Sequence, residues 1–172
     1  ALTLSAASSA DSTDRKIDKM LHAIQDFEMP TSKKGFEKSN KAADERWKYF
    51  DKNKVKSLAA IRTFTSEHLT TGDLADFAIM DMGYYLSLKG NDNDKTLAID
   101  ALQALDLDAK VVTTNGQQLF EHINRLAQTK DERLLPIMKT LYLERDGNYV
   151  GNNYMHLLTN ITGAKLVFYV FG

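Results

Sequence analysis

The sequence predicts an all-α protein built from stacked antiparallel helical hairpins, for three reasons. Apolar residues recur along most of the chain at intervals of three and four, which places them on one face of a helix and suits no strand. The chain has only two prolines, Pro30 and Pro136, and nine glycines, whereas sandwiches and barrels need many turns. Its 172 residues are 43% apolar, which suits one domain with a proper core. We expect about eight helices on this pattern.

The N-terminal half predicts three consecutive helices. The first spans about residues 14–27 and ends before Pro30, because a residue that precedes proline avoids the helical region. The second extends to Phe50 and the third covers about residues 53–68. The apolar pattern slips between them, so we expect a turn near Asp51. The residues expected to face the core are Ile17, Met20, Leu21, Ile24 and Phe27, then Phe36, Ala43, Trp47 and Phe50, then Val55, Leu58, Ile61 and either Phe64 or Thr65.

A fourth helix that ends at about Leu88 is expected to lie in the interior of the domain. It is apolar over much of its circumference, as a helix surrounded by others must be. The break at residues 70–72 precedes it, and Gly90 follows its end. Its apolar residues are Leu74, Phe77, Ala78, Met80, Met82, Tyr84, Tyr85 and Leu88.

Shorter segments follow this central helix. A fifth helix continues to about Leu105, and a further helix covers about residues 116–127. Residues 109–115 contain adjacent valines and fit either a strand or a helix. Polar residues that can cap the helices are Ser12 or Thr13 for the first, Thr31 and Ser32 for the second, Asp73 for the fourth, and Asn93 or Asp94 for the fifth.

Residues 131–163 predict two antiparallel helices joined by a tight turn. Asp131 and Glu132 stand where a helix N-terminus favours negative charge. Residues 145–148 combine a cation, a glycine and an asparagine, which suits the end of one helix and the start of the next. The apolar positions at helical spacing are Leu134, Met138, Leu141, Tyr142, Val150, Tyr154, Leu157, Leu158 and Ile161. Neither helix can bury its apolar face alone, so we expect the pair to stack on a neighbouring pair.

This hairpin resembles a repeat of the HEAT family. The positions that carry the resemblance are Leu134, Leu135 and Pro136 in the first helix, and Asp146, Val150 and Leu158 in the turn and second helix. The sequence departs from the family pattern at Gly151, where HEAT repeats usually have Arg, and at Tyr154 and Leu157, where they usually have Ala. The resemblance covers residues 131–163 and implies a HEAT-like α-solenoid with a broad surface for binding other proteins.

The chain is expected to form one α-helical domain over residues 13–172, preceded by a flexible tail or export-signal remnant in residues 1–12. The small residues at 8–10 suit a signal-peptidase site, which favours a bacterial protein exported to the periplasm or the medium. A cytoplasmic protein is the alternative. Residues 164–171 end in large apolar side chains that fit a strand or a helix. We expect either that this segment is buried against the body of the domain or that the chain is part of a longer repeat array, and we favour the second.

No motif in the sequence indicates catalysis. The absence of cysteine excludes disulfides, thiolate nucleophiles and Cys-bound zinc. The four histidines fall on four different expected helices and lack metal-binding spacing. The alternative is an enzyme, such as a metal-dependent hydrolase, whose site is assembled only in space. Its candidate residues are Asp73, Asp76, Asp81, His68 and His122.

Two polar turns resemble calcium-binding loops but lack the residues that such loops need. Counted from Asp92, Leu97 and Gln103 stand where a calcium loop has Gly and Glu. Counted from Asp146, Leu157 stands where the Glu belongs. We therefore expect no metal ion and no cofactor.

Positive charge is concentrated in residues 33–56, where nine basic side chains accompany four acidic ones, although the whole chain has a net charge of −1. If the helix is continuous, six of the lysines fall near one stripe at helical spacing: Lys34, Lys38, Lys41, Lys48, Lys52 and Lys56. The first five are the candidate partner-binding residues. Such a stripe could bind an acidic partner or an anionic surface. We favour the other interpretation, an ordinary solvated helix face, because basic residues are common on exposed helix faces and the whole chain is slightly acidic.

The leading functional hypothesis is a non-enzymatic protein–protein interaction module whose partner is a protein or peptide. Stacked hairpins present broad surfaces, and no catalytic motif competes with that interpretation. The alternatives are the enzyme described above and a binder of anionic surfaces through residues 33–56. Nucleic acid is a poor candidate partner because the chain is slightly acidic, and no apolar run is long enough to predict a transmembrane segment.

Overall fold

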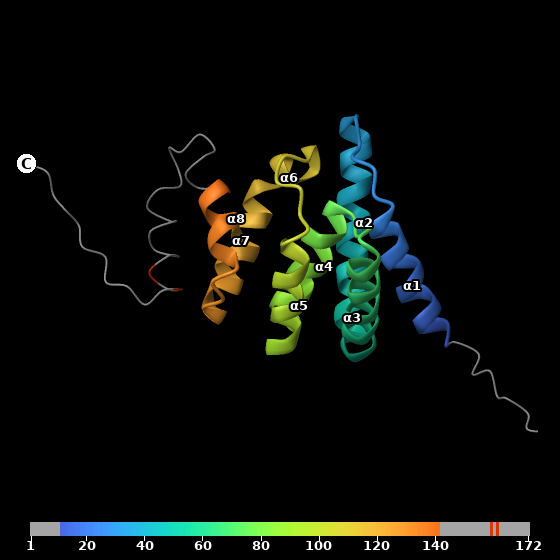
Figure 1. Cartoon of the computed structure of the whole chain (residues 1–172). Coiled ribbons are helices and arrows are strands. Elements are labelled where there is room, and N and C mark those ends of the chain that lie inside the picture. Colours follow the sequence, from blue (N-terminus) through green and yellow to red (C-terminus); the bar gives the residue numbers. More distant parts are fainter. Residues whose placement is uncertain (1–10, 142–158, 160, 162–172) are drawn as a thin grey trace, which may run out of the picture.

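The computed structural model describes residues 11–141, 159 and 161. This part of the chain forms eight α-helices, one 3₁₀ turn and no strand, which confirms the all-α prediction (Figure 1). The elements are α1 (Ser12–Gln25), α2 (Lys33–Lys52), α3 (Lys54–Thr71), α4 (Asp76–Lys89), α5 (Asp92–Leu102), α6 (Lys110–Thr114), α7 (Gly116–Leu126), the 3₁₀ turn Ala127–Thr129 and α8 (Leu134–Lys139).

The central helix of the fold is α4. It contacts α1, α3, α5, α6 and α7, and Figure 1 shows it between α1–α3 at one end of the molecule and α7–α8 at the other. Most residues from Ala78 to Ser87 are buried, as a helix with neighbours on several sides requires. The predicted interior position of this helix is therefore confirmed. Leu88 is an exception at 36% exposed, because it lies in the last turn of the helix.

The first three helices pack largely as the apolar pattern predicts. Ile17, Leu21 and Ile24 are buried on α1, which contacts α3 and α4. A turn at Asn53 separates α2 from α3, close to the turn expected near Asp51. Two residues predicted to face the core do not. Phe36 is 41% exposed and Val55 is 83% exposed, and both lie in the first turn of their helices, where neighbouring elements cover less of the surface.

The structure corrects three of the predicted helix caps. The actual N-caps are Asp11 for α1, Ala75 for α4 and Asn91 for α5, in place of Ser12 or Thr13, Asp73, and Asn93 or Asp94. Ser32 caps α2 as expected. For α1 and α5 the neighbouring polar residues can all bond to nearby backbone, and the backbone before the helix selects among them. At α4 the Asp73 side chain bonds to His68 and Thr71 instead, and the helix follows Ala75 without a side-chain cap.

Near the C-terminal end of the described residues, the structure decides between strand and helix for one segment and corrects the predicted start of one helix. Residues 110–114 form a helix, α6. Helix α8 begins at Leu134 and not at Asp131, and Ile161 is buried in the core. Most of the second half of the predicted hairpin, in 142–158, and the apolar segment 164–171 lie outside the described residues, as does the predicted tail in 1–10.

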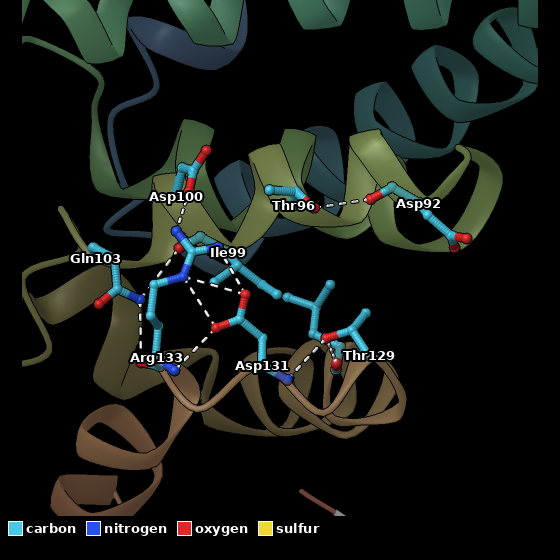
Figure 2. A network of polar contacts seen from close by, with 9 residues as sticks. Asp92, Thr96, Ile99, Asp100, Gln103, Thr129, Asp131 and Arg133 are labelled. Carbon is cyan, nitrogen blue, oxygen red and sulfur yellow. Dashed lines mark hydrogen bonds and ion pairs between the residues drawn. The ribbon is translucent and has the colours of Figure 1, made fainter.

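A polar network fastens the loop before α8 to α5 (Figure 2). The Arg133 guanidinium donates to both carboxylate oxygens of Asp131, with 2.7 Å from its terminal nitrogen to Oδ2, and also to Asp100 on α5. The side-chain amide of Gln103 donates to the Arg133 carbonyl over 3.3 Å. Arg133 also holds the pKa of Asp131 below its usual value. These groups are partly exposed, so the network orients the loop more than it adds stability.

Candidate functional site

A cleft of about 390 Å³ opens between α2 on one side and α4, the α6–α7 junction and α7 on the other. The loop between α1 and α2 closes one end of it. Its lining includes five aromatic side chains: Phe27, Phe36, Trp47, Phe77 and Tyr84. We therefore call it the aromatic cleft. Met29, Pro30 and Ala43 add apolar surface, and the polar lining includes Ser39, Asn40, Asp44, Asp81, Gln118 and Glu121.

Two stacked rings form the end of the cleft near the α1–α2 loop. The rings of Phe27 and Phe77 lie 3.8 Å apart between centroids at an interplanar angle of 22°. Phe27 follows the end of α1 and Phe77 lies in the first turn of α4, so this contact joins the loop to the central helix. Both rings are half-buried and leave apolar surface facing the cleft.

One lining residue of the cleft, Asp81, takes part in a buried ion pair. The Arg46 guanidinium donates to Asp81 Oδ2 over 2.9 Å, and the Trp47 indole N–H donates to Asp81 Oδ1 over 3.2 Å. Both members of the pair are about nine-tenths buried. Because an unpaired buried charge is very costly, this arrangement fixes α2 against α4 and sets the orientation of the Trp47 ring.

Tyr84, on the wall of the cleft, covers a buried histidine. The His122 ring is 0% exposed and meets the Tyr84 ring edge-on, with 6.1 Å between centroids. Neither of its nitrogens has a hydrogen-bond partner among the described residues. Burial, with the nearby positive charge of Arg125, lowers the pKa of His122 to about 3. The ring is therefore neutral at physiological pH, and no ligand in the cleft can reach it.

The structure does not bring the predicted enzyme residues into one site. His68 and Asp73 do meet at the surface, with 2.8 Å from Nδ1 to Oδ1. Asp76 instead accepts a hydrogen bond from the backbone N–H of Asp106, Asp81 pairs with Arg46, and His122 is buried behind Tyr84. In the part of the chain that the structure describes, no group of three or more His, Cys, Asp or Glu side chains is arranged to hold a metal ion.

The predicted lysine stripe lies on α2, on the side away from the aromatic cleft. With 3.6 residues per turn, the five lysines fall within an arc of about 80°, roughly opposite Phe36, Ala43 and Trp47. All five are exposed, and none has an ion pair with another described residue: Lys34, Lys38, Lys41, Lys48 and Lys52. Lys56, the sixth lysine predicted for the stripe, lies instead on α3 and pairs with Asp11 and Asp14, because the helix is interrupted at Asn53. Glu45 falls within the stripe and reduces its charge.

Comparison with known protein families, with curated proteins and with solved structures gives no significant match for this chain. The HEAT-like resemblance of residues 131–163 therefore stays a prediction. No helix in residues 11–141 is both long and apolar enough to cross a membrane.

Sequence reasoning missed the aromatic cleft. Trp47, Phe27 and Phe77 had been assigned to the core, and each is in fact only half-buried. The one available signal was the apolar run around Met29 and Pro30 in a loop, where the chain cannot bury such residues within a helix of its own. Periodicity identifies which residues share a helix face, but it does not show whether another element fully covers that face.

Proposed function

We propose that this chain is a non-enzymatic protein–protein interaction module, and that a partner binds in the aromatic cleft. The observation that supports this most is the lining of five partly exposed aromatic side chains. Aromatic residues are enriched at protein interfaces, where they dominate binding energy. The volume of the cleft falls within the range of ordinary ligand-binding pockets and suits a few side chains of a docked segment.

In the same proposal, the helices belong to a HEAT-like stack of helical hairpins, and the protein is exported by a bacterium. The support for the first part is the apolar pattern of residues 131–163 together with the buried side chains of Leu134, Met138 and Ile161. The support for the second part is the small-residue composition at 8–10.

The enzyme alternative receives less support. Its five candidate residues occupy separate places, and only His68 and Asp73 are in contact. A surface His–Asp pair of this kind also occurs in many proteins as a simple turn contact, and here Asp73 also accepts a hydrogen bond from the Thr71 hydroxyl.

Binding of an acidic partner through the lysine stripe is a second candidate function, and a separate observation supports it. The five lysines of the stripe on α2 have no ion-pair partners among the described residues, so the stripe is available to an acidic protein or an anionic surface. Binding through exposed charges separated by more than about 10 Å weakens steeply as salt rises above 0.1 M.

The test is capture of partners from the native source by four immobilised proteins, with identification of bound proteins by mass spectrometry. Ala43→Phe fills the cleft, and Ala42→Phe makes the same change at the next position on α2, outside the cleft lining. Lys38→Glu, Lys41→Glu and Lys48→Glu combined reverse the stripe. The wild type is the fourth protein.

We expect a partner that the wild type and Ala42→Phe recover equally and that Ala43→Phe loses, with little effect of the lysine reversal or of salt, because apolar burial does not depend on ionic screening. Loss of the same partner with the lysine reversal and at high salt, but not with Ala43→Phe, would instead support the basic stripe. Circular dichroism checks that all four proteins keep their helical content.

A further inference from the structure

The charged side chains that line the aromatic cleft are all acidic. Among the described residues, its lining contains the carboxylates of Asp44, Asp81 and Glu121 and no lysine, arginine or histidine. The described lining therefore offers acidic groups with no cation among them, which favours a positively charged ligand.

Two of the three carboxylates have no compensating cation. Arg46 neutralises Asp81 from within the protein. Asp44 on α2 and Glu121 on α7 are exposed, and neither has an ion pair with another described residue. Glu121 accepts a hydrogen bond over 3.3 Å from the side-chain amide of Gln117, which carries no charge. The two walls of the cleft therefore each contribute a free negative charge.

The aromatic lining also favours a positively charged ligand. The face of an aromatic ring carries partial negative charge and attracts cations, and tryptophan does so most strongly. Trp47 is held in place by its hydrogen bond to Asp81 and lies 5.7 Å from Tyr84 between ring centroids. Lys41 and Lys48 lie one turn from Asp44 on α2. Arg125 lies one turn from Glu121 on α7, with its guanidinium 5.7 Å from the centroid of the Tyr84 ring. None of these three cations lines the cleft or forms an ion pair with the two carboxylates.

The cleft also extends beyond the space that one cation needs. The apolar side chains of Met29, Pro30 and Phe36 line it next to the rings. A free small cation would leave this apolar surface uncovered, whereas a peptide could place a cationic side chain between the carboxylates and apolar neighbours on the remaining wall.

From this complementarity we infer that the aromatic cleft binds a segment of a partner protein that presents a lysine or arginine next to large apolar residues. The inference rests on the proposed function and specifies the chemistry of the partner. The cation lies over the ring of Trp47 and within reach of Asp44 and Glu121, and its apolar neighbours pack on Phe36 and Pro30.

The chain provides its own reporter for this interaction. Trp47 is the only tryptophan in the sequence and it lines the cleft. Occupation of the cleft therefore changes the one tryptophan fluorescence signal of the protein.

The probes are 12-residue peptides. They are selected from a random phage-displayed library on the full-length protein, then synthesised and titrated against it.

Two double variants isolate the role of charge. Asp44→Asn with Glu121→Gln removes the two free carboxylates of the cleft. Glu45→Gln with Glu132→Gln removes two exposed carboxylates outside the lining and gives the same change in net charge.

We expect selected peptides to contain Lys or Arg beside apolar residues and to change Trp47 fluorescence in a saturable way. The cleft variant should bind them about fivefold to tenfold more weakly, as the loss of two partly exposed ion pairs implies, and the control variant should bind them as the wild type does.

The outcomes separate this inference from the proposed function. Peptides that perturb Trp47 but lack basic residues, and that bind the cleft variant and the wild type equally, would overturn the cationic inference while leaving the cleft as a protein-binding site. Selected peptides that bind without any change in Trp47 fluorescence, and equally to Ala43→Phe, would overturn both.

Discussion

At the scale of single residues, His122 is a neutral histidine whose burial makes stability depend on pH. The pKa of its side chain is about 3 in the folded protein and 6.5 in the unfolded chain. Below pH 6.5 the unfolded chain therefore binds a proton that the folded protein does not. This part of the stability is complete above pH 6.5 and falls as the pH drops toward 3.

Replacement of His122 by Leu tests this dependence. We expect the free energy of unfolding to fall less steeply between pH 6.5 and pH 4 in His122→Leu than in the wild type, as measured by urea denaturation at several pH values. Ile123→Val, at a buried neighbour on the same helix, controls for general destabilisation and should keep the wild-type slope. Parallel slopes for the wild type and His122→Leu would show that the histidine is not buried in its neutral form.

Asp94 joins the start of α5 to α3. Its carboxylate accepts hydrogen bonds from the Arg62 guanidinium, over 2.8 Å at one of the two contacts, and from the backbone N–H of Asn91 over 2.7 Å. Arg62 is the main reason why the pKa of Asp94 lies below its usual value. The carboxylate therefore stabilises the fold above the unfolded-state pKa of about 3.9, and this contribution is lost as the pH falls through the folded value.

Asp94→Ala is expected to cost about 2–4 kcal/mol, because it removes the carboxylate that accepts from the backbone N–H of the N-cap Asn91 and leaves a partly buried arginine without its partner. Asp92→Ala removes a carboxylate that is 94% exposed in the same first turn, and it should cost less than about 0.5 kcal/mol. Chemical denaturation at pH 7 measures both. Equal losses in the two variants would contradict the role of Asp94 in joining the start of α5 to α3.

At the scale of secondary-structure elements, the close approach of α4 and α7 depends on Gly83. A Cβ atom added at this position would lie 2.8 Å from Cε1 of His122, and the buried ring has little room to move. Gly83→Ala is therefore expected to destabilise the protein by about 1–3 kcal/mol, even though alanine is the better helix former.

Gly116 provides the matched control for Gly83. A Cβ atom there would meet nothing within 4 Å, so Gly116→Ala should be neutral or slightly stabilising. Combining Gly83→Ala with His122→Ala should recover part of the loss, because the clash is between these two residues. Thermal unfolding is measured for the wild type, Gly83→Ala, His122→Ala, the double variant and Gly116→Ala. Strict additivity of the two single changes in the double variant would contradict the contact.

The elements themselves were largely predictable, and the reasons for the errors are local. The interior position of α4 followed from its apolar circumference, and the break near Asn53 followed from the slip in the apolar pattern. The cap of α4 was not predictable, because Asp73 could bond either to the helix or, as it does, to Thr71 and His68 in the turn. Residues 110–114 were ambiguous because valine pairs fit strands and helices alike until their neighbours are known.

At the scale of the whole molecule, the aromatic cleft could not be predicted, since it depends on how α2 sits relative to α4 and α7. The same periodic pattern predicts Phe50 and Phe36 as core residues, yet Phe50 is 2% exposed and Phe36 is 41% exposed. The lysine stripe was predictable because it needs only the geometry of one helix. Its exposure agrees with that geometry, and its role stays a prediction.

The most direct test of the proposed function is amide hydrogen exchange of the protein alone and in complex with its captured partner. If the partner binds in the aromatic cleft, protection should increase in residues 27–47 and 114–121, which form its walls, while α3 should exchange as it does in the free protein. Protection that appears only in segments outside the cleft, with residues 27–47 and 114–121 unchanged, would contradict the account.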